Sequence, residues 1–136
     1  MRRLLVFLLL LGCGQRSTTI AMHEQNNSGQ DGTAALIDLG DGRIDVTEIL
    51  KPSTFPGPQS SHIHKGHCDD LREIEYYIFQ LTGDDGGQSF AVDGGTITFH
   101  NVIPAGWSDI FDGDHAINVH DPRDNGLYVS CGDLTP

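Results

Sequence analysis

The chain has 136 residues, of which 8 are basic and 19 are acidic, and its formal charge at neutral pH is −11. This length supports one domain rather than two. A strongly acidic surface argues against nucleic acid and anionic lipid head groups as partners. The sequence also has no G-x-S-x-G elbow, phosphate-binding loop or C-x-x-C motif, so hydrolase, nucleotide-binding and thiol-redox functions have no support.

The first twelve residues differ in composition from the rest of the chain. Arg2 and Arg3 precede an unbroken apolar run over 4–11, which is too short to span a bilayer as a permanent helix and is typical of a secretory signal. The run ends in Leu10-Leu11-Gly12-Cys13, which resembles the bacterial lipobox. We therefore expect a signal peptide over 1–12 and lipidation of Cys13, with an ordinary cleaved signal as the alternative. In both cases the protein is exported.

The segment after Cys13 is polar and lacks apolar periodicity, so residues 13–32 are predicted to be a flexible tether. Residues 33–136 are predicted to be the folded domain. Within it, short apolar runs are separated by Gly, Asp, Asn and Pro, a pattern typical of an antiparallel sandwich or barrel. The strands are expected at 34–39, 43–50, 60–65, 75–81, 88–92, 96–102, 115–120 and 127–131. Residues 69–76 come nearest to a turn of helix.

Two histidines in a predicted strand could share a ligand. Side chains two apart in a strand point to the same face, so His62 and His64 can direct two imidazoles at one point. A third histidine, His120, ends a later apolar strand. Three imidazoles with no thiolate favour copper or zinc, although an H-x-H pair alone is weak evidence.

These features together resemble the copper/zinc superoxide dismutase family. The shared residues are His62-Ile63-His64, Cys68, the segment Ala116 to His120, and Cys131-Gly132, in that order. The resemblance implies an all-β, Greek-key β-sandwich, copper ligands at His62, His64 and His120, and a disulfide between Cys68 and Cys131. Export agrees with the disulfide, because cysteines outside the cytoplasm usually pair.

The sequence also departs from the family. No histidine lies between Cys68 and Phe99, where the family has its bridging histidine and zinc ligands, so a second site for zinc is not expected. The family's arginine, three residues before the last cysteine, is replaced by Tyr128, which carries no charge at neutral pH. Arg123 is nearby, but Asp121 and Asp124 would offset its field. We expect superoxide dismutation, if present, to be slow, with no catalytic residue assigned.

The H-I-H stretch also resembles CHRD-type domains, for which no catalytic role is established. The leading interpretation is an exported copper-binding domain of the bacterial cell envelope or periplasm, attached to the membrane by its lipid alone. The alternative is a non-catalytic structural, adhesion or metal-binding module. A second copy of the chain or a metal-donor protein remains open as a further partner. Of the other histidines, His67 is expected in a loop, and His100 and His115 on the surface.

Overall fold

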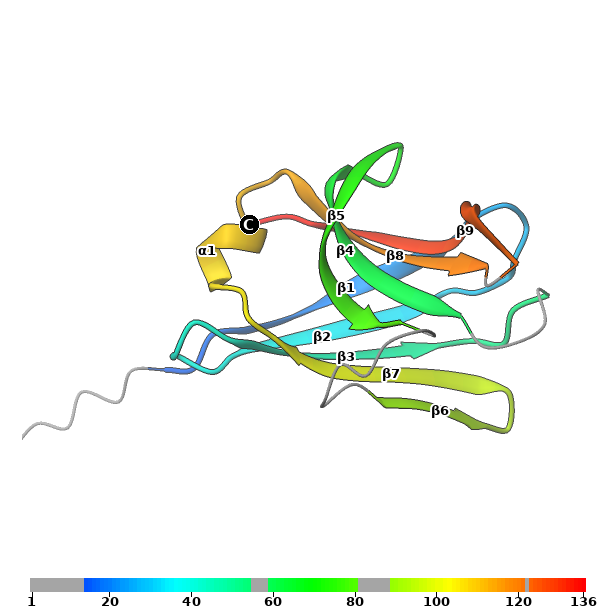
Figure 1. The fold of residues 1–136 in the computed structure, drawn as a ribbon. Coiled ribbons are helices and arrows are strands. Elements are labelled where there is room, and N and C mark those ends of the chain that lie inside the picture. The colour runs from blue at the N-terminus through cyan, green and yellow to red at the C-terminus, as the bar shows by residue number, and fades with distance from the viewer. Residues whose placement is uncertain (1–13, 55–58, 81–88, 122) are drawn as a thin grey trace, which may run out of the picture.

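The computed structural model describes residues 14–54, 59–80, 89–121 and 123–136. The described residues form strands and one short helix (Figure 1). In chain order these are β1 (Ser17–Glu24), β2 (Gly32–Asp38), β3 (Ile44–Leu50), β4 (Ser60–His67), β5 (Asp70–Phe79), β6 (Ser89–Asp93), β7 (Thr96–Ile103), α1 (Trp107–Ile110), β8 (His115–Asp121) and β9 (Asp124–Leu134). None of the described helices is long and apolar enough to cross a membrane. The prediction of an all-β domain is confirmed.

The strands form one antiparallel sheet in the order β5-β4-β8-β9-β1-β2-β3-β7-β6. This sheet curls, so that β4, β5, β8 and β9 lie over β1, β2, β3, β6 and β7 (Figure 1). The side-chain amide of Asn101 on β7 donates a hydrogen bond to the carbonyl oxygen of Tyr77 on β5 (3.0 Å), which links the two layers near their open side. The chain changes layer three times, from β3 to β4, from β5 to β6 and from β7 to β8.

The core fills the space between the layers and follows the two-residue period of the strands. In β3, Ile44, Val46, Glu48 and Leu50 are buried, whereas the residues between them are partly or fully exposed. This alternation is expected for a sheet with one solvated face. Apolar residues of both layers complete the core, including Ile63, Phe99, Ile103, Ile117 and Val119.

The predicted tether over 13–32 is wrong for residues 17–24, which form β1 between β2 and β9. Only Ile20, Ala21 and Met22 in this strand are apolar, because one face of β1 is open to solvent. Met22 is fully buried in the core, and Ile20 packs against the core. The pattern was missed because the β-branched Thr18 and Thr19 favour a strand without giving an apolar signal. The folded domain therefore begins before residue 33. The signal peptide and Cys13 lie outside the described residues.

A second difference concerns the segment after β4. Residues 69–76, expected to come nearest to a turn of helix, belong largely to β5, which begins at Asp70. The predicted strand at 75–81 overlaps β5. The other seven predicted strands are found with small changes in their ends. Hairpin turns lie at Asp41-Gly42 and Gly94-Gly95, with positive φ angles at all three glycines.

One carboxyl group in the core is expected to make stability depend on pH. Glu48 is fully buried, and its Oε2 accepts a hydrogen bond from the hydroxyl of Ser61 (2.5 Å). Burial raises the pKa of Glu48 to about 8, although the Ser61 hydrogen bond opposes the shift. Since the folded pKa exceeds the unfolded one, the folded state is favoured by protonation. The contribution of Glu48 to stability is greatest below about pH 4.5 and is lost as the pH rises through about 8.

We predict that Glu48→Gln removes this loss. Between pH 5 and 8 the free energy of unfolding of the wild type should fall relative to the variant by about 1 kcal/mol per pH unit. Urea unfolding at several pH values measures the difference. Glu73→Gln, at an exposed side chain, is the matched control and should show no such trend. Parallel pH profiles for wild type and Glu48→Gln would contradict the prediction.

Candidate metal centre

The outer face of β4 carries His62 and His64. The alternate residues Ser61 and Ile63 point inward, since Ser61 bonds to the core carboxyl of Glu48 and Ile63 belongs to the apolar core. His62 and His64 must therefore point the other way. Their ring centroids are 5.9 Å apart. The prediction that the two histidines share one face is confirmed.

The pairing of β8 with β4 brings His120 to the same face. Ile63 lies opposite Ile117 and Ser61 lies opposite Val119 in the register, and Ile117 and Val119 are both core residues. His120, next to Val119, therefore points outward. Its ring centroid lies 4.9 Å from that of His62 and 5.2 Å from that of His64. Folding thus brings together three imidazoles from strands far apart in sequence.

The edge strand β5 and the residue that follows it hold two of these rings. The Nδ1–H of His64 donates to the carbonyl oxygen of Arg72 (2.8 Å). The Nε2–H of His62 donates to Oε1 of Gln80 (2.6 Å). Both contacts depend on irregular pairing, because the register of β4 against β5 shifts three times along their length. Such bulges redirect side chains at functional sites.

Gly66 explains part of this irregularity. Its φ angle is +91°, a conformation that favours glycine, and a Cβ atom there would lie 2.1 Å from the carbonyl oxygen of Asp70. The turn from β4 into β5 can therefore be this tight only with glycine at position 66. The turn sets the path of β5, and this path places the carbonyl oxygen of Arg72 next to His64.

The tautomers set by these hydrogen bonds leave a lone pair on one ring nitrogen of His64 and on one of His62. With Nδ1 of His64 protonated, its Nε2 is bare, and this atom lies 3.0 Å from Nε2 of His120. With Nε2 of His62 protonated, its Nδ1 is bare; that atom is buried and has no hydrogen-bond partner among the described residues. One nitrogen from each of the three rings lies within 4.8 Å of the others, and no other group of this kind occurs in the described parts of the chain.

One distance in this cluster fits a shared metal ion. Imidazole nitrogens bind metals at about 2.0 to 2.1 Å, so two nitrogens on one ion are separated by about 2.9 to 3.4 Å. The distance between His64 Nε2 and His120 Nε2 falls in that range. A set of three neutral imidazoles without a thiolate suits copper or zinc. The donor atoms that the structure offers are Nδ1 of His62, Nε2 of His64 and Nε2 of His120.

Burial keeps His62 and His64 uncharged at neutral pH. The side chains of His62, His64 and His120 belong to residues only 3 to 4% exposed. Burial lowers the pKa of His62 to about 4, against the hydrogen bond to Gln80 and with help from the nearby His120 and His64. Burial likewise lowers the pKa of His64, although the Arg72 carbonyl opposes it. His62 and His64 are thus neutral at physiological pH, as metal ligation requires.

Two tyrosines stand beside the histidines. Tyr77 makes an edge contact with His62 at 5.1 Å between ring centroids, and Tyr128 makes one with His120 at 5.2 Å. Tyr128 lies directly opposite His120 in the pairing of β8 and β9. The nearby Arg123 is bonded to Asp121 through both Nε and Nη2, at 3.0 and 2.6 Å. The expected offset of Arg123 by Asp121 is therefore observed.

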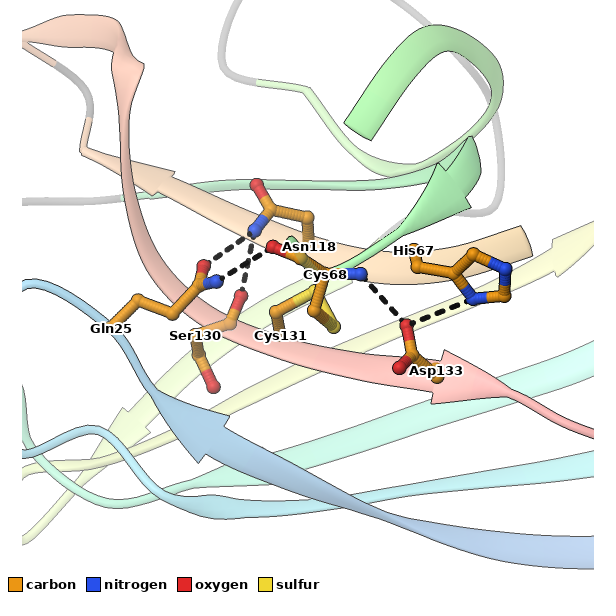
Figure 2. Close-up of a disulfide and its surroundings, with 7 residues drawn as sticks. All are labelled: Gln25, His67, Cys68, Asn118, Ser130, Cys131 and Asp133. Carbon is orange, nitrogen blue, oxygen red and sulfur yellow. Dashed lines mark hydrogen bonds and ion pairs between the residues drawn. A yellow bond between two sulfur atoms is a disulfide. The ribbon is translucent and has the colours of Figure 1, made fainter. Parts of the chain in front are cut away.

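Cys68 and Cys131 form the disulfide that the resemblance implied, with their Cα atoms 5.8 Å apart. It ties the turn after β4 to β9, although β8 lies between these strands in the sheet. Figure 2 shows how the surroundings hold this crosslink: Gln25 donates to the carbonyl oxygen of Cys68, and Asn118 donates to Gln25. The amide of Cys68 donates to Asp133 (2.8 Å). The crosslink thus fixes the two strands that flank β8.

Other histidines lie outside this cluster. His115 was expected on the surface but is buried, and its two ring nitrogens lie 2.8 Å from Asp112 and 2.7 Å from Glu75. His100 lies 3.2 Å from Asp45 and is half-buried. His67 ends β4 with an exposed side chain 3.8 Å from Asp133, so its expected loop position is only approximate.

Sequence reasoning missed the groups that support the ligands. The Arg72 contribution is a backbone carbonyl, which no side-chain pattern reveals. Gln80 and Tyr77 reach the cluster only because β5 forms and pairs irregularly with β4. Gly66 was the only available signal, as a glycine inside a strand often marks a bulge.

Comparison of the chain with protein-family models, with curated proteins and with solved structures finds no match.

The buried histidines should titrate very differently. We expect the pKa of His62 near 4, because burial disfavours its charged form. Burial also lowers the pKa of His115, but its hydrogen bonds to Asp112 and Glu75 outweigh that effect and raise the pKa above 6.5. His115 therefore contributes stability that is complete below about pH 6.5 and is lost as the pH rises through its folded pKa. NMR titration of the imidazole C–H signals measures both values. Similar midpoints for the two residues would disprove the assignment of their environments.

Proposed function

We propose that the protein is an exported domain that binds a single copper ion through His62 Nδ1, His64 Nε2 and His120 Nε2. The observation that carries the proposal is the buried Nδ1 of His62, a residue of the cluster, because this atom has no partner among the described residues. A buried polar atom without a hydrogen bond is costly, and a metal ion would satisfy it.

The arrangement of motifs on the strands supports a dismutase-like fold. The H-x-H pair, the later histidine and the cysteine before a final glycine lie on β4, β8 and β9, which are neighbours in the sheet. The three crossings between layers are compatible with a Greek-key sandwich. We therefore extend the resemblance to the copper/zinc superoxide dismutase family from the motifs to the fold.

The support for His62 and His64 comes from β5 rather than from a second metal. β5 and Gln80 occupy the stretch in which the family has its zinc loop, and they hold the rings with a peptide carbonyl and an amide oxygen. Among the described residues, the histidine cluster is the one group with convergent metal-ligand atoms. A single-ion site therefore accounts for the residues better than a copper and zinc pair.

Copper would supply one-electron chemistry at this site, but the residues around it argue for slow dismutation. Superoxide is an anion, and the chain has a formal charge of −11, which repels it. Tyr128 replaces the family's arginine, and Arg123 is bonded to Asp121. The histidines are also almost completely covered. Binding or holding copper is thus better supported than rapid turnover.

The alternative is a non-catalytic CHRD-type structural or adhesion module. One observation favours it: the Nε2 of His120 could donate directly to the Nε2 of His64 at 3.0 Å, which would satisfy both atoms without an ion. That arrangement still leaves Nδ1 of His62 without a partner. Metal uptake therefore separates the two functions.

The proposed lipid anchor has a structural consequence. If Cys13 carries the lipid, only residues 14–16 separate it from β1, which begins at Ser17. Three extended residues reach about 10 Å. The domain would then lie close to the membrane surface instead of standing clear of it on a long spacer, and a metal-donor protein would have to reach the site at that surface.

Isothermal titration with copper tests the central proposal. We expect one copper ion per wild-type chain, and a loss of affinity in His120→Ala of more than about 100-fold, beyond what removal of a supporting residue usually costs. His100→Ala, which removes an imidazole outside the cluster, is the matched control and should bind like the wild type. Absence of copper uptake by the wild type would leave the structural module as the function.

The same proteins test turnover. Copper-loaded wild type should dismute superoxide slowly, at a rate that exceeds that of His120→Ala. Equal rates would remove the enzymatic part of the proposal and leave copper binding intact.

A further inference from the structure

The two nitrogens of the His62 ring have different environments. Nε2 lies 2.6 Å from Oε1 of Gln80, and Nδ1 is buried without a partner among the described residues. Because an amide oxygen only accepts hydrogen bonds, the ring must carry its proton on Nε2 to bond with it. Nδ1 then keeps the lone pair that a metal needs. Gln80 therefore determines which nitrogen of His62 can be a ligand.

Gln80 is well placed for this role by the end of β5. It directly follows Phe79, the last residue of the strand, and Tyr77 on the same strand packs its ring against His62. The ring of His62 is thus held by a hydrogen bond and by an aromatic contact from one short segment. Supporting residues of this kind orient metal-binding histidines and tune their basicity.

The acceptors at the two β4 histidines are uncharged. His62 bonds to the amide oxygen of Gln80, and His64 bonds to the peptide oxygen of Arg72. In metal sites this position is often taken by a carboxylate, which makes the imidazole a stronger donor. An enclosed site with neutral ligands and neutral acceptors places the whole charge of the ion in a poorly solvated environment. Burial then costs more for a doubly charged ion than for a singly charged one.

Resting on the proposed copper site, we propose that Gln80 is a positioning residue that fixes His62 as an Nδ1 ligand and, because it is uncharged, favours the cuprous ion over the cupric ion. The difference between an amide and a carboxylate at this one position sets the preference for oxidation state. Arg72 contributes a backbone carbonyl, which no substitution of its side chain removes, so Gln80 is the position at which the preference can be changed.

The positioning role is tested first on the metal-free protein. Long-range ¹⁵N–¹H NMR spectra should show the proton of His62 on Nε2 in the wild type and in Gln80→Glu. In Gln80→Leu, which has no acceptor, the Nε2–H form should lose its dominance, and copper affinity should fall by about 10- to 100-fold. A proton on Nδ1 in the wild type, or unchanged copper affinity in Gln80→Leu, would overturn this role.

The effect on oxidation state is tested by the reduction potential of the copper-loaded protein. Gln80→Glu should favour Cu²⁺ over Cu⁺ by about tenfold or more, which lowers the one-electron potential by about 59 mV or more. Gln15→Glu adds the same charge at an exposed residue before β1 and serves as the matched control. A shift in Gln80→Glu no larger than in Gln15→Glu would overturn the proposed preference while copper binding stood.

Failure of the proposed function gives a different result. If the wild type takes up no copper, the preference for oxidation state is overturned together with the copper site. The tautomer of His62, measured without metal, still decides whether Gln80 positions the ring.

Discussion

The antiparallel register between β4 and β8 is the constraint on which the site depends. It places Ile63 opposite Ile117 and Ser61 opposite Val119 on the core side, and so sends His62, His64 and His120 to the outer face. Since side chains alternate along a strand, a slip of one residue would move the histidines into the core and the apolar residues into solvent. The burial of Ile63, Ile117 and Val119 therefore holds the ligands in place, and the disulfide at Cys68 and Cys131 restrains the strands on either side of β8.

The charge distribution of the molecule favours the proposed binding of a metal ion over the turnover of superoxide. An acidic protein attracts cations over a distance and repels anions, so the −11 charge suits delivery of a metal ion better than capture of superoxide. Around His62 and His64 the hydrogen-bond acceptors are neutral, and the nearby guanidinium of Arg123 is bonded to Asp121. The site therefore combines three candidate nitrogen ligands with a surface that does not attract an anionic substrate.

The sequence predicts the histidine cluster and the disulfide better than the groups that support them. His62, His64, His120, Cys68 and Cys131 could be found because their types and order are specific. The polar strand β1 could not, because one of its faces is solvated and only Met22 is fully buried. Gln80 and the Arg72 carbonyl depend on the bulged pairing of β5, which a single sequence does not encode in a recognisable pattern. His115 was misjudged for a similar reason, since one of its carboxylate partners, Glu75, is distant in sequence.

A crystal structure of the copper-loaded protein, with the ion located by its anomalous scattering, tests the account most directly. We predict one peak, about 2.0 to 2.1 Å from His62 Nδ1, His64 Nε2 and His120 Nε2, with Gln80 still bonded to Nε2 of His62. Copper bound at other residues, or an ion ligated through Nε2 of His62, would contradict it.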